Sequence, residues 1–116
     1  MSYGFHSFLN DYILKNKVRK ILEIGIADSE NAKTMILVAS KNFPVENIEY
    51  YGFDIFGGDS DSHFKRVQQK LVVTGCHVSL FKGDSTVTLP KFIENYRFLH
   101  LVFHIYTQFL VKASLF

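Results

Sequence analysis

The stretch VRKILEIGIADSENAKTM at residues 18–35 decides the fold of this chain. Its first part is an apolar run that carries Glu23 and closes on Gly25, which predicts a strand and a tight turn. Its second part opens with polar residues and continues with the apolar spacing of a helix. Such strand–turn–helix units build nucleotide-type cofactor sites, because glycine permits close backbone approach and a helix start offers unpaired N–H groups.

Length and composition describe one ordinary folded domain. The 116 residues predict a single domain over 1–116. A hydrophobic fraction of 47% and a charged fraction of 21% argue against disorder. The net charge is only +2 and the basic residues are scattered, which favours solvated helix faces over a nucleic-acid surface.

Cysteine content and the two ends of the chain bear on its compartment. Cys76 is the single cysteine, which excludes an intrachain disulfide and a CxxC pair. We therefore expect a reducing, cytoplasmic environment. The N-terminus lacks the pattern of a signal peptide. Residues 98–116 are rich in Leu, Phe and Val, but polar residues interrupt them, whereas a membrane span needs roughly 20 mainly apolar residues. We expect no membrane partner.

Strand-like and helix-like patterns alternate along the chain. The expected strands cover 18–24, 48–55, 77–82 and 98–105, and the expected helices cover 3–17, 29–41, about 64–75, a segment from about Thr88, and a short end within 106–113. This alternation predicts an α/β fold with a parallel sheet and helices on both faces. We expect a partial, Rossmann-like doubly wound sheet with strand order 3-2-1-4.

Three expected strand ends carry residues suited to a ligand. The first ends in the Gly25 turn, the second in Asp54, and the third in Gly83 and Asp84. A carboxylate such as Asp54 can accept hydrogen bonds from vicinal ribose hydroxyls, and Asp84 could accept one from a purine amine. Each aspartate alone is also typical of a turn or helix cap. Their order, one crossover apart, favours a shared site at the carboxyl edge of the sheet.

These motifs resemble a known family. The runs ILEIGIADSENAKTMI, EYYGFDIF and KLVVTGCHVSLFKGDSTVTLPKF are similar to the cofactor half of a class I S-adenosylmethionine-dependent methyltransferase. The resemblance implies that Glu23 and the turn lie beside the methionine part and ribose of S-adenosylmethionine, that Asp54 holds the ribose, and that Asp84 and Ser85 face the adenine. The implied cofactor-binding residues are Glu23, Gly25, Ala27, Ser29, Asp54, Gly83, Asp84 and Ser85. The methyl acceptor is not identified.

The chain departs from the family pattern in two places. Family members usually have a second glycine in the first turn, where this chain has Ala27 and Ser29. Ser29 adds a Cβ at a position where the backbone needs a positive φ. Family members also continue through an acidic segment and three further strands, whereas residues 98–116 diverge from that pattern. The domain therefore resembles one truncated after strand four, with an edge that predicts a homo-oligomer.

The sequence assigns no catalytic residue and no metal site. His100 and His104 could form a base or metal pair, or be polar positions on a half-exposed strand. His63 could contact a substrate or be an exposed residue at a helix start. Asp59 and Asp61 suit a hard cation or a turn.

Two other functions stay open. The chain could be a non-catalytic remnant that binds the cofactor, or an interaction module that pairs through its open sheet edge. It could also be an NAD-dependent oxidoreductase. The match to G-x-G-x-x-G is poor, because Ala27 and Glu30 follow Gly25, and Asp54 would suit a ribose in either case.

Overall fold

Parallel strands form the centre of the molecule in this computed structural model, which describes residues 3–57, 61–103 and 110–113. The strands are β1 (Lys20–Ile24), β2 (Glu49–Asp54) and β3 (His77–Lys82). β2 lies between the other two and pairs in parallel with both. The register places Ile24 beside Phe53 and Phe53 beside Phe81, so the three strands end at one edge of the sheet.

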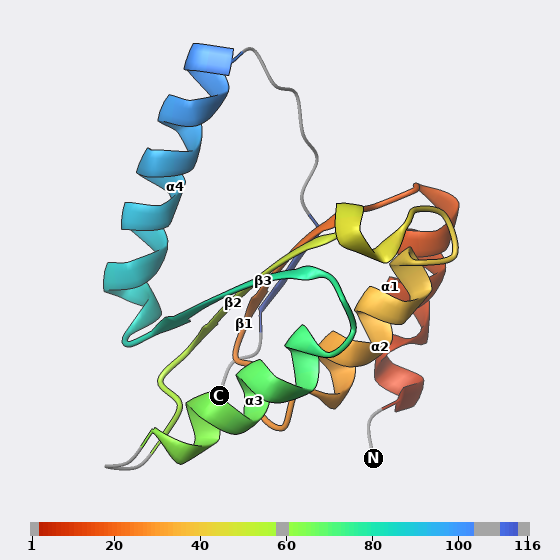
Figure 1. Ribbon diagram of the computed structural model, residues 1–116, viewed down its shortest axis with the longest axis horizontal. Coiled ribbons are helices and arrows are strands. Elements are labelled where there is room, and N and C mark those ends of the chain that lie inside the picture. The colour runs from red at the N-terminus through yellow and green to blue at the C-terminus, as the bar shows by residue number, and fades with distance from the viewer. Residues whose placement is uncertain (1–2, 58–60, 104–109, 114–116) are drawn as a thin grey trace.

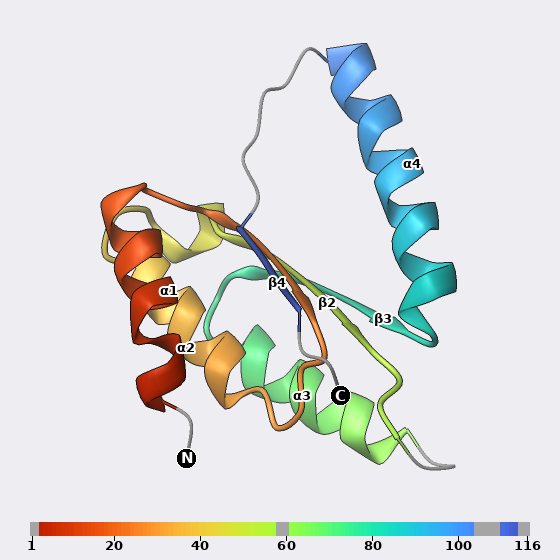
Figure 2. The same cartoon turned by 180° about the vertical axis from the view of Figure 1, so that it is seen from behind.

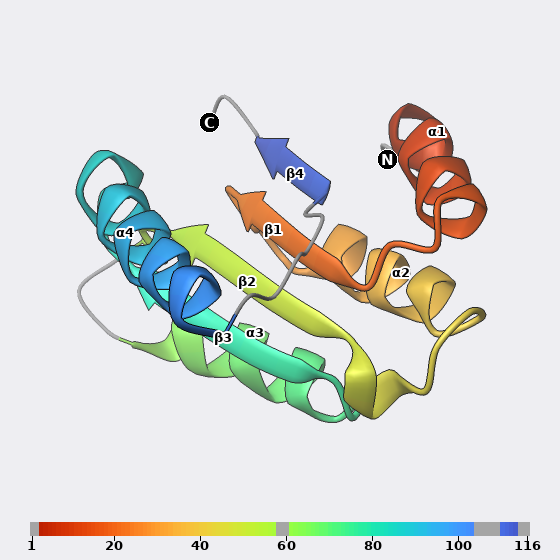
Figure 3. The same cartoon turned by 90° about the horizontal axis from the view of Figure 1, so that it is seen from above.

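Helices cover both faces of this sheet. They are α1 (Tyr3–Lys15), α2 (Glu30–Ala39), α3 (Ser62–Val72) and α4 (Ser85–Phe103), with a 3-10 turn η1 (Val45–Asn47) before β2. Figure 3 shows α2 and α3 on one face and α4 on the other. α1 packs against α2. Parallel strands need such crossovers, and here the two helices that connect β1, β2 and β3 lie on the same side.

The hydrophobic core lies between the sheet and α2 and α3. Ala32, Met35, Ile36 and Ala39 recur at helical spacing on α2 and are all buried. The other buried members of the core are Ile13, Val18, Ile21, Ile26, Ile48, Tyr50, Phe56, Val67, Leu71 and Cys76. On the opposite face Phe92 of α4 covers the rings of Tyr51, Phe53 and Phe81. These aromatic contacts attach the first half of α4 to the sheet.

Gly52 in the middle of β2 permits close packing over the sheet. A Cβ at this position would lie 2.5 Å from Cδ1 of Ile26 and 2.9 Å from Cδ2 of Leu80. Ile26 belongs to the turn after β1 and is buried. The absent side chain of Gly52 therefore lets that turn sit directly on the sheet.

The α/β class, the parallel sheet and the flanking helices agree with the sequence prediction. The first helix is also present, but helical spacing predicts that Phe8, Tyr12 and Ile13 share its buried face, and this is wrong in part. Ile13 is buried, whereas Phe8 is 67% and Tyr12 48% exposed. Because helical spacing alone does not say which stripe of a short helix faces its neighbour, the aromatic positions were misassigned.

The predicted strand at 98–105 is wrong. Its described part, up to Phe103, continues α4, which begins at Ser85 rather than near Thr88 and contains Pro90 in its interior. Short apolar runs do not distinguish a strand from a helix by periodicity, which explains the error. Figures 1 and 2 show α4 extending well beyond the sheet.

A short strand, β4 (Leu110–Ala113), pairs in parallel with the other edge of β1. A terminal helix was expected over these residues, so that prediction is wrong for 110–113, and the rest of the segment lies outside the described residues. Within residues 3–57, 61–103 and 110–113, no helix combines the length and apolar character needed to cross a bilayer.

Candidate functional site

A pocket of about 400 Å³ lies at the carboxyl ends of β1, β2 and β3. In open parallel sheets this edge is where ligands bind, because the loops that follow the strands converge there. The residues that line it are Ile24, Gly25, Ala27, Phe53, Asp54, Ile55, His63, Gly83, Asp84 and Ser85. The structure thus brings together six of the eight residues predicted for the site: Gly25, Ala27, Asp54, Gly83, Asp84 and Ser85.

The turn between β1 and α2 has an unusual backbone. Gly25, Ala27 and Ser29 have φ values of 83°, 54° and 69°, so every second residue of the turn is left-handed. The amide of Gly25 donates to the carbonyl of Phe53 at 2.8 Å, which ties the start of the turn to β2. The expectation of a positive φ at Ser29 is confirmed. Left-handed Ala and Ser are unfavourable, so surrounding contacts must hold this turn in place.

Asp54 supplies the main contact to this turn. Its Oδ2 accepts hydrogen bonds from the amides of Ile26 at 2.6 Å and Ala27 at 3.3 Å, and its Oδ1 accepts one from Phe56 at 2.9 Å. Partial burial alone would raise the pKa of Asp54, but these three amides and the neighbouring His63 outweigh it and hold the pKa below its ordinary value. Asp54 is therefore a charged group at neutral pH.

The described partners of the Asp84 carboxylate all belong to the helix that follows it. Its Oδ1 accepts hydrogen bonds from the amide of Thr86 at 2.9 Å and the hydroxyl of Thr86 at 2.8 Å. The amide bond to Thr86, followed by the hydroxyl bond, lowers the pKa of Asp84. This is the helix-cap arrangement, here at the start of α4. The carboxylate nevertheless lines the pocket from an exposed position.

Glu23 and Ser29 are the two predicted site residues that do not line the pocket. Both are completely buried. Glu23 accepts hydrogen bonds from the hydroxyl of Tyr50 at 2.6 Å and the amide of Asn31 at 3.2 Å. Burial, and then the charge of Glu23, raise the pKa of Tyr50 well above its ordinary value, which keeps its hydroxyl protonated as the donor. This network joins β1, β2 and α2 beneath the turn.

Ser29 occupies the residue before α2 without acting as a side-chain cap. Its hydroxyl oxygen is buried and has no hydrogen-bond partner among the described residues. The amide of Glu30 is instead bound by Oδ1 of Asp28 at 3.1 Å. Asp28 therefore binds an amide at the start of α2, and the side chain of Ser29 does not.

His63 also lines the pocket. It is half-buried at the start of α3, and its Nε2 lies 2.6 Å from the carbonyl oxygen of Ala27. Its ring makes an edge contact with buried Phe56 at 5.4 Å. The sequence offered a substrate contact or an exposed residue at a helix start; the position at the helix start is confirmed, and the side chain is of intermediate exposure. Ile55 was missed altogether, although it is 67% exposed and presents an apolar surface to the pocket.

The electrostatic character of the pocket is acidic. Asp54 and Asp84 contribute two carboxylates, and neither lysine nor arginine is among the described residues that line it. Lys82, at the end of β3, is paired with Asp61 at 2.6 Å. The hydrogen bond from Lys82, and then its charge, lower the pKa of Asp61. Such a pocket favours ligands that donate hydrogen bonds or carry positive charge.

The other candidates from the sequence lie apart from the pocket or outside the description. Asp59 and His104 are outside the described residues, and His100 belongs to α4. Cys76 is buried, and burial raises the pKa of its thiol. In the described part of the chain, no group of three or more His, Cys, Asp or Glu side chains is placed to hold a metal ion.

Comparison with known proteins leaves the family undetermined. No protein-family model matches the chain, and no curated protein sequence is detectably similar to it.

Proposed function

We propose that this chain binds S-adenosylmethionine as the cofactor domain of a class I methyltransferase. The observation that carries the proposal is that three strand-end motifs, far apart in the sequence, line one pocket. Gly25 and Ala27 follow β1, Asp54 ends β2, and Asp84 follows β3. A pocket of about 400 Å³ lies within the usual size range of small-molecule and cofactor sites, roughly 300–1,000 Å³.

The residues that line the pocket fit an adenosyl group. Asp54 is a charged acceptor for ribose hydroxyls, and Asp84 is an acceptor that an adenine amine could reach across the pocket. Ile24, Phe53 and Ile55 supply apolar surface for the base. Glu23 supports this site from the core, because its hydrogen bonds to Tyr50 and Asn31 connect β1 to β2 and α2.

The charges disfavour a dinucleotide. A pyrophosphate would need free amides in the turn after β1. Here the amides of Ile26 and Ala27 already donate to the Asp54 carboxylate. Two carboxylates, with no lysine or arginine among the described residues that line the pocket, would repel a pyrophosphate, whereas they would attract the cationic sulfonium of S-adenosylmethionine. This contrast supports the methyl donor over NAD.

The chemistry would come from the cofactor. S-adenosylmethionine supplies an electrophilic methyl group on sulfur, and the protein contributes alignment of donor and acceptor. Alignment of two reactants is worth up to roughly 7–11 kcal/mol in well-oriented cases. Asp54, Asp84 and the turn at Gly25 would hold the adenosyl end. We further propose that β4 takes the place of the fourth strand in a 3-2-1-4 Rossmann-like order.

Calorimetric titration tests the proposal directly. S-adenosylhomocysteine should bind with one site per chain, and NAD should not bind at the same concentrations. Asp54→Asn should weaken S-adenosylhomocysteine binding, and the exposed, distant His77→Gln should not. NAD binding in place of S-adenosylhomocysteine would favour the oxidoreductase. Binding of S-adenosylhomocysteine without methyl transfer to any offered acceptor would favour the non-catalytic remnant.

A further inference from the structure

The turn at residues 25–29 is held from two sides. On one side the amides of Ile26 and Ala27 donate to Oδ2 of Asp54. On the other side two side chains of α3 donate to the turn's carbonyl oxygens. His63 Nε2 lies 2.6 Å from the oxygen of Ala27, and Lys70 Nζ lies 2.9 Å from the oxygen of Asp28. One helix thus binds two consecutive carbonyls of the turn that lines the pocket.

The two α3 side chains are placed together by helix geometry. His63 and Lys70 are seven residues apart, close to two turns, so they emerge on the same side of α3. Lys70 also forms an ion pair with Glu30 at 2.7 Å, which extends the contact into α2. The His63 ring is steadied by its edge contact with buried Phe56. We call His63 and Lys70 the α3 clamp.

The turn needs this support because its backbone is unfavourable. Ala27 and Ser29 are non-glycine residues with φ values of 54° and 69°. Such residues keep a left-handed conformation only where surrounding contacts impose it. Without the α3 clamp, the carbonyl of Ala27 would lose its donor and the turn could relax away from Asp54.

The hydrogen bonds of Asp54 indicate that the α3 clamp is needed when a ligand binds. A carboxylate offers about four acceptor sites, and amides of Ile26, Ala27 and Phe56 occupy three of them. A vicinal diol that donates two hydrogen bonds needs two sites, so one amide must give way. The Ala27 amide, at 3.3 Å, is the longest of the three and the easiest to release.

We propose that His63 and Lys70 are positioning residues of the pocket. They hold the turn by its carbonyls, so that Asp54 can exchange the Ala27 amide for a ligand hydroxyl without loss of the turn's shape. The part of this proposal that concerns the ligand rests on the proposed function. The part that concerns the turn depends only on contacts within the chain.

The first test measures the turn in the protein without ligand. Amide hydrogen exchange of Ile26 and Ala27 is compared in wild type, His63→Leu and His63→Gln, with global stability measured by urea unfolding. We expect faster exchange in His63→Leu by about fivefold to tenfold beyond any global change, the scale of one lost hydrogen bond. His63→Gln, which keeps an N–H donor, should recover part of the protection. Unchanged exchange in His63→Leu would overturn the proposal.

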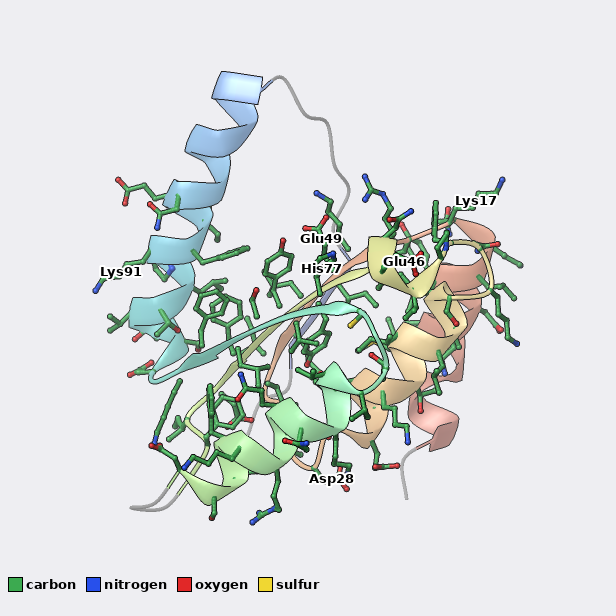
Figure 4. The ribbon with its side chains drawn as sticks, in the orientation of Figure 1. Lys17, Asp28, Glu46, Glu49, His77 and Lys91 are labelled. Carbon is green, nitrogen blue, oxygen red and sulfur yellow. The ribbon has the colours of Figure 1, made fainter. Side chains whose placement is uncertain are left out.

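A control variant at His77 and a second variant at Lys70 accompany this test. His77 is exposed at the start of β3 and lies far from turn residue Asp28 in Figure 4, so His77→Leu should leave exchange of the turn unchanged. Lys70→Met removes the other half of the α3 clamp and should also speed exchange of the turn. It serves as the test where His63→Leu fails to fold. If Lys70→Met leaves the exchange unchanged, Lys70 is not a positioning residue.

The second test uses calorimetry with S-adenosylhomocysteine. His63→Leu should bind it about fivefold to tenfold more weakly than wild type, and His63→Gln should bind it at an intermediate strength. Equal affinities of wild type and His63→Leu would overturn the positioning role. If wild type itself does not bind, the proposed function fails, while the exchange experiment still decides whether the α3 clamp holds the turn.

Discussion

Asp54 ends β2 and Asp84 lies two residues after the end of β3, and both line the same pocket, yet the protein holds them in different ways. Asp54 is bonded to amides of Ile26 and Ala27 from a turn 28 and 27 residues away in sequence. Among the described residues, the carboxylate of Asp84 is bonded to Thr86 alone, two residues along. A lowered pKa marks both carboxylates, so the pKa direction does not separate them. The difference lies in the sequence distance to the bonded residues. Asp54 joins two elements of the fold, whereas Asp84 stabilises one helix start.

The largest expected effect comes from removal of the long-range carboxylate. Asp54→Ala should weaken S-adenosylhomocysteine binding by about 1.5–3 kcal/mol, the scale of hydrogen bonds to a charged group. It should also destabilise the fold, because amides of Ile26, Ala27 and Phe56 lose their acceptor. Calorimetry and urea unfolding measure the two effects.

Asp84→Ala is the comparison variant for this experiment. It removes a local cap and one pocket carboxylate, so both losses should be smaller than those of Asp54→Ala. Equal losses from the two variants would contradict the distinction between a long-range and a local carboxylate. Unchanged affinity in Asp54→Ala would remove Asp54 from the binding site.

The next largest effect is expected from the close packing of Ile26 over Gly52. Gly52→Ala would place a Cβ 2.5 Å from Cδ1 of Ile26, so the side chains packed over Gly52 must shift and the free energy of unfolding should fall by roughly 1–3 kcal/mol. Gly57→Ala is the matched control, since a Cβ there meets nothing within 4 Å. Urea unfolding of both variants measures the difference. Equal stability of the two variants would show that the turn does not depend on the space above Gly52.

The charge of Asp54 predicts a dependence of stability on acid. Its pKa is lower in the folded protein than its ordinary value of 3.8, so its ionised form stabilises the fold above that value. This contribution should disappear as the pH falls below 3.8 toward the folded pKa. Urea unfolding measured from about pH 6 down to about pH 3 should show a steeper loss in wild type than in Asp54→Asn. Parallel curves would mean that Asp54 is not a stabilising charge.

The smallest effect concerns strain in the turn. Ser29 has a φ of 69° and a buried hydroxyl that lacks a partner among the described residues. Ser29→Gly removes both penalties, so stability should rise by roughly 1 kcal/mol, and S-adenosylhomocysteine binding should be kept or improved. Thermal unfolding and calorimetry measure these changes. A clear loss of stability would show that Ser29 contributes packing that outweighs its strain.

The sequence by itself determined the elements that local pattern encodes. Alternating apolar runs gave the positions of β1, β2 and β3, and helical spacing gave α2 and its buried face, because a residue's neighbours within one or two turns dictate both. The carboxyl edge of a parallel sheet then placed Gly25, Asp54 and Asp84 at one pocket. The resemblance of the turn to the methyltransferase pattern, which has a second glycine there, also predicted the positive φ of Ser29.

Tertiary structure alone decided how these residues are used. Glu23 points into the core to meet Tyr50, Asp54 binds the turn, and His63 reaches a carbonyl 36 residues away. Likewise α4 continues where a strand was predicted, because periodicity alone does not distinguish a strand from a helix in a short apolar run. Contacts between residues so distant in sequence leave no local pattern, and only the assembled sheet and helices bring the donors and acceptors within reach.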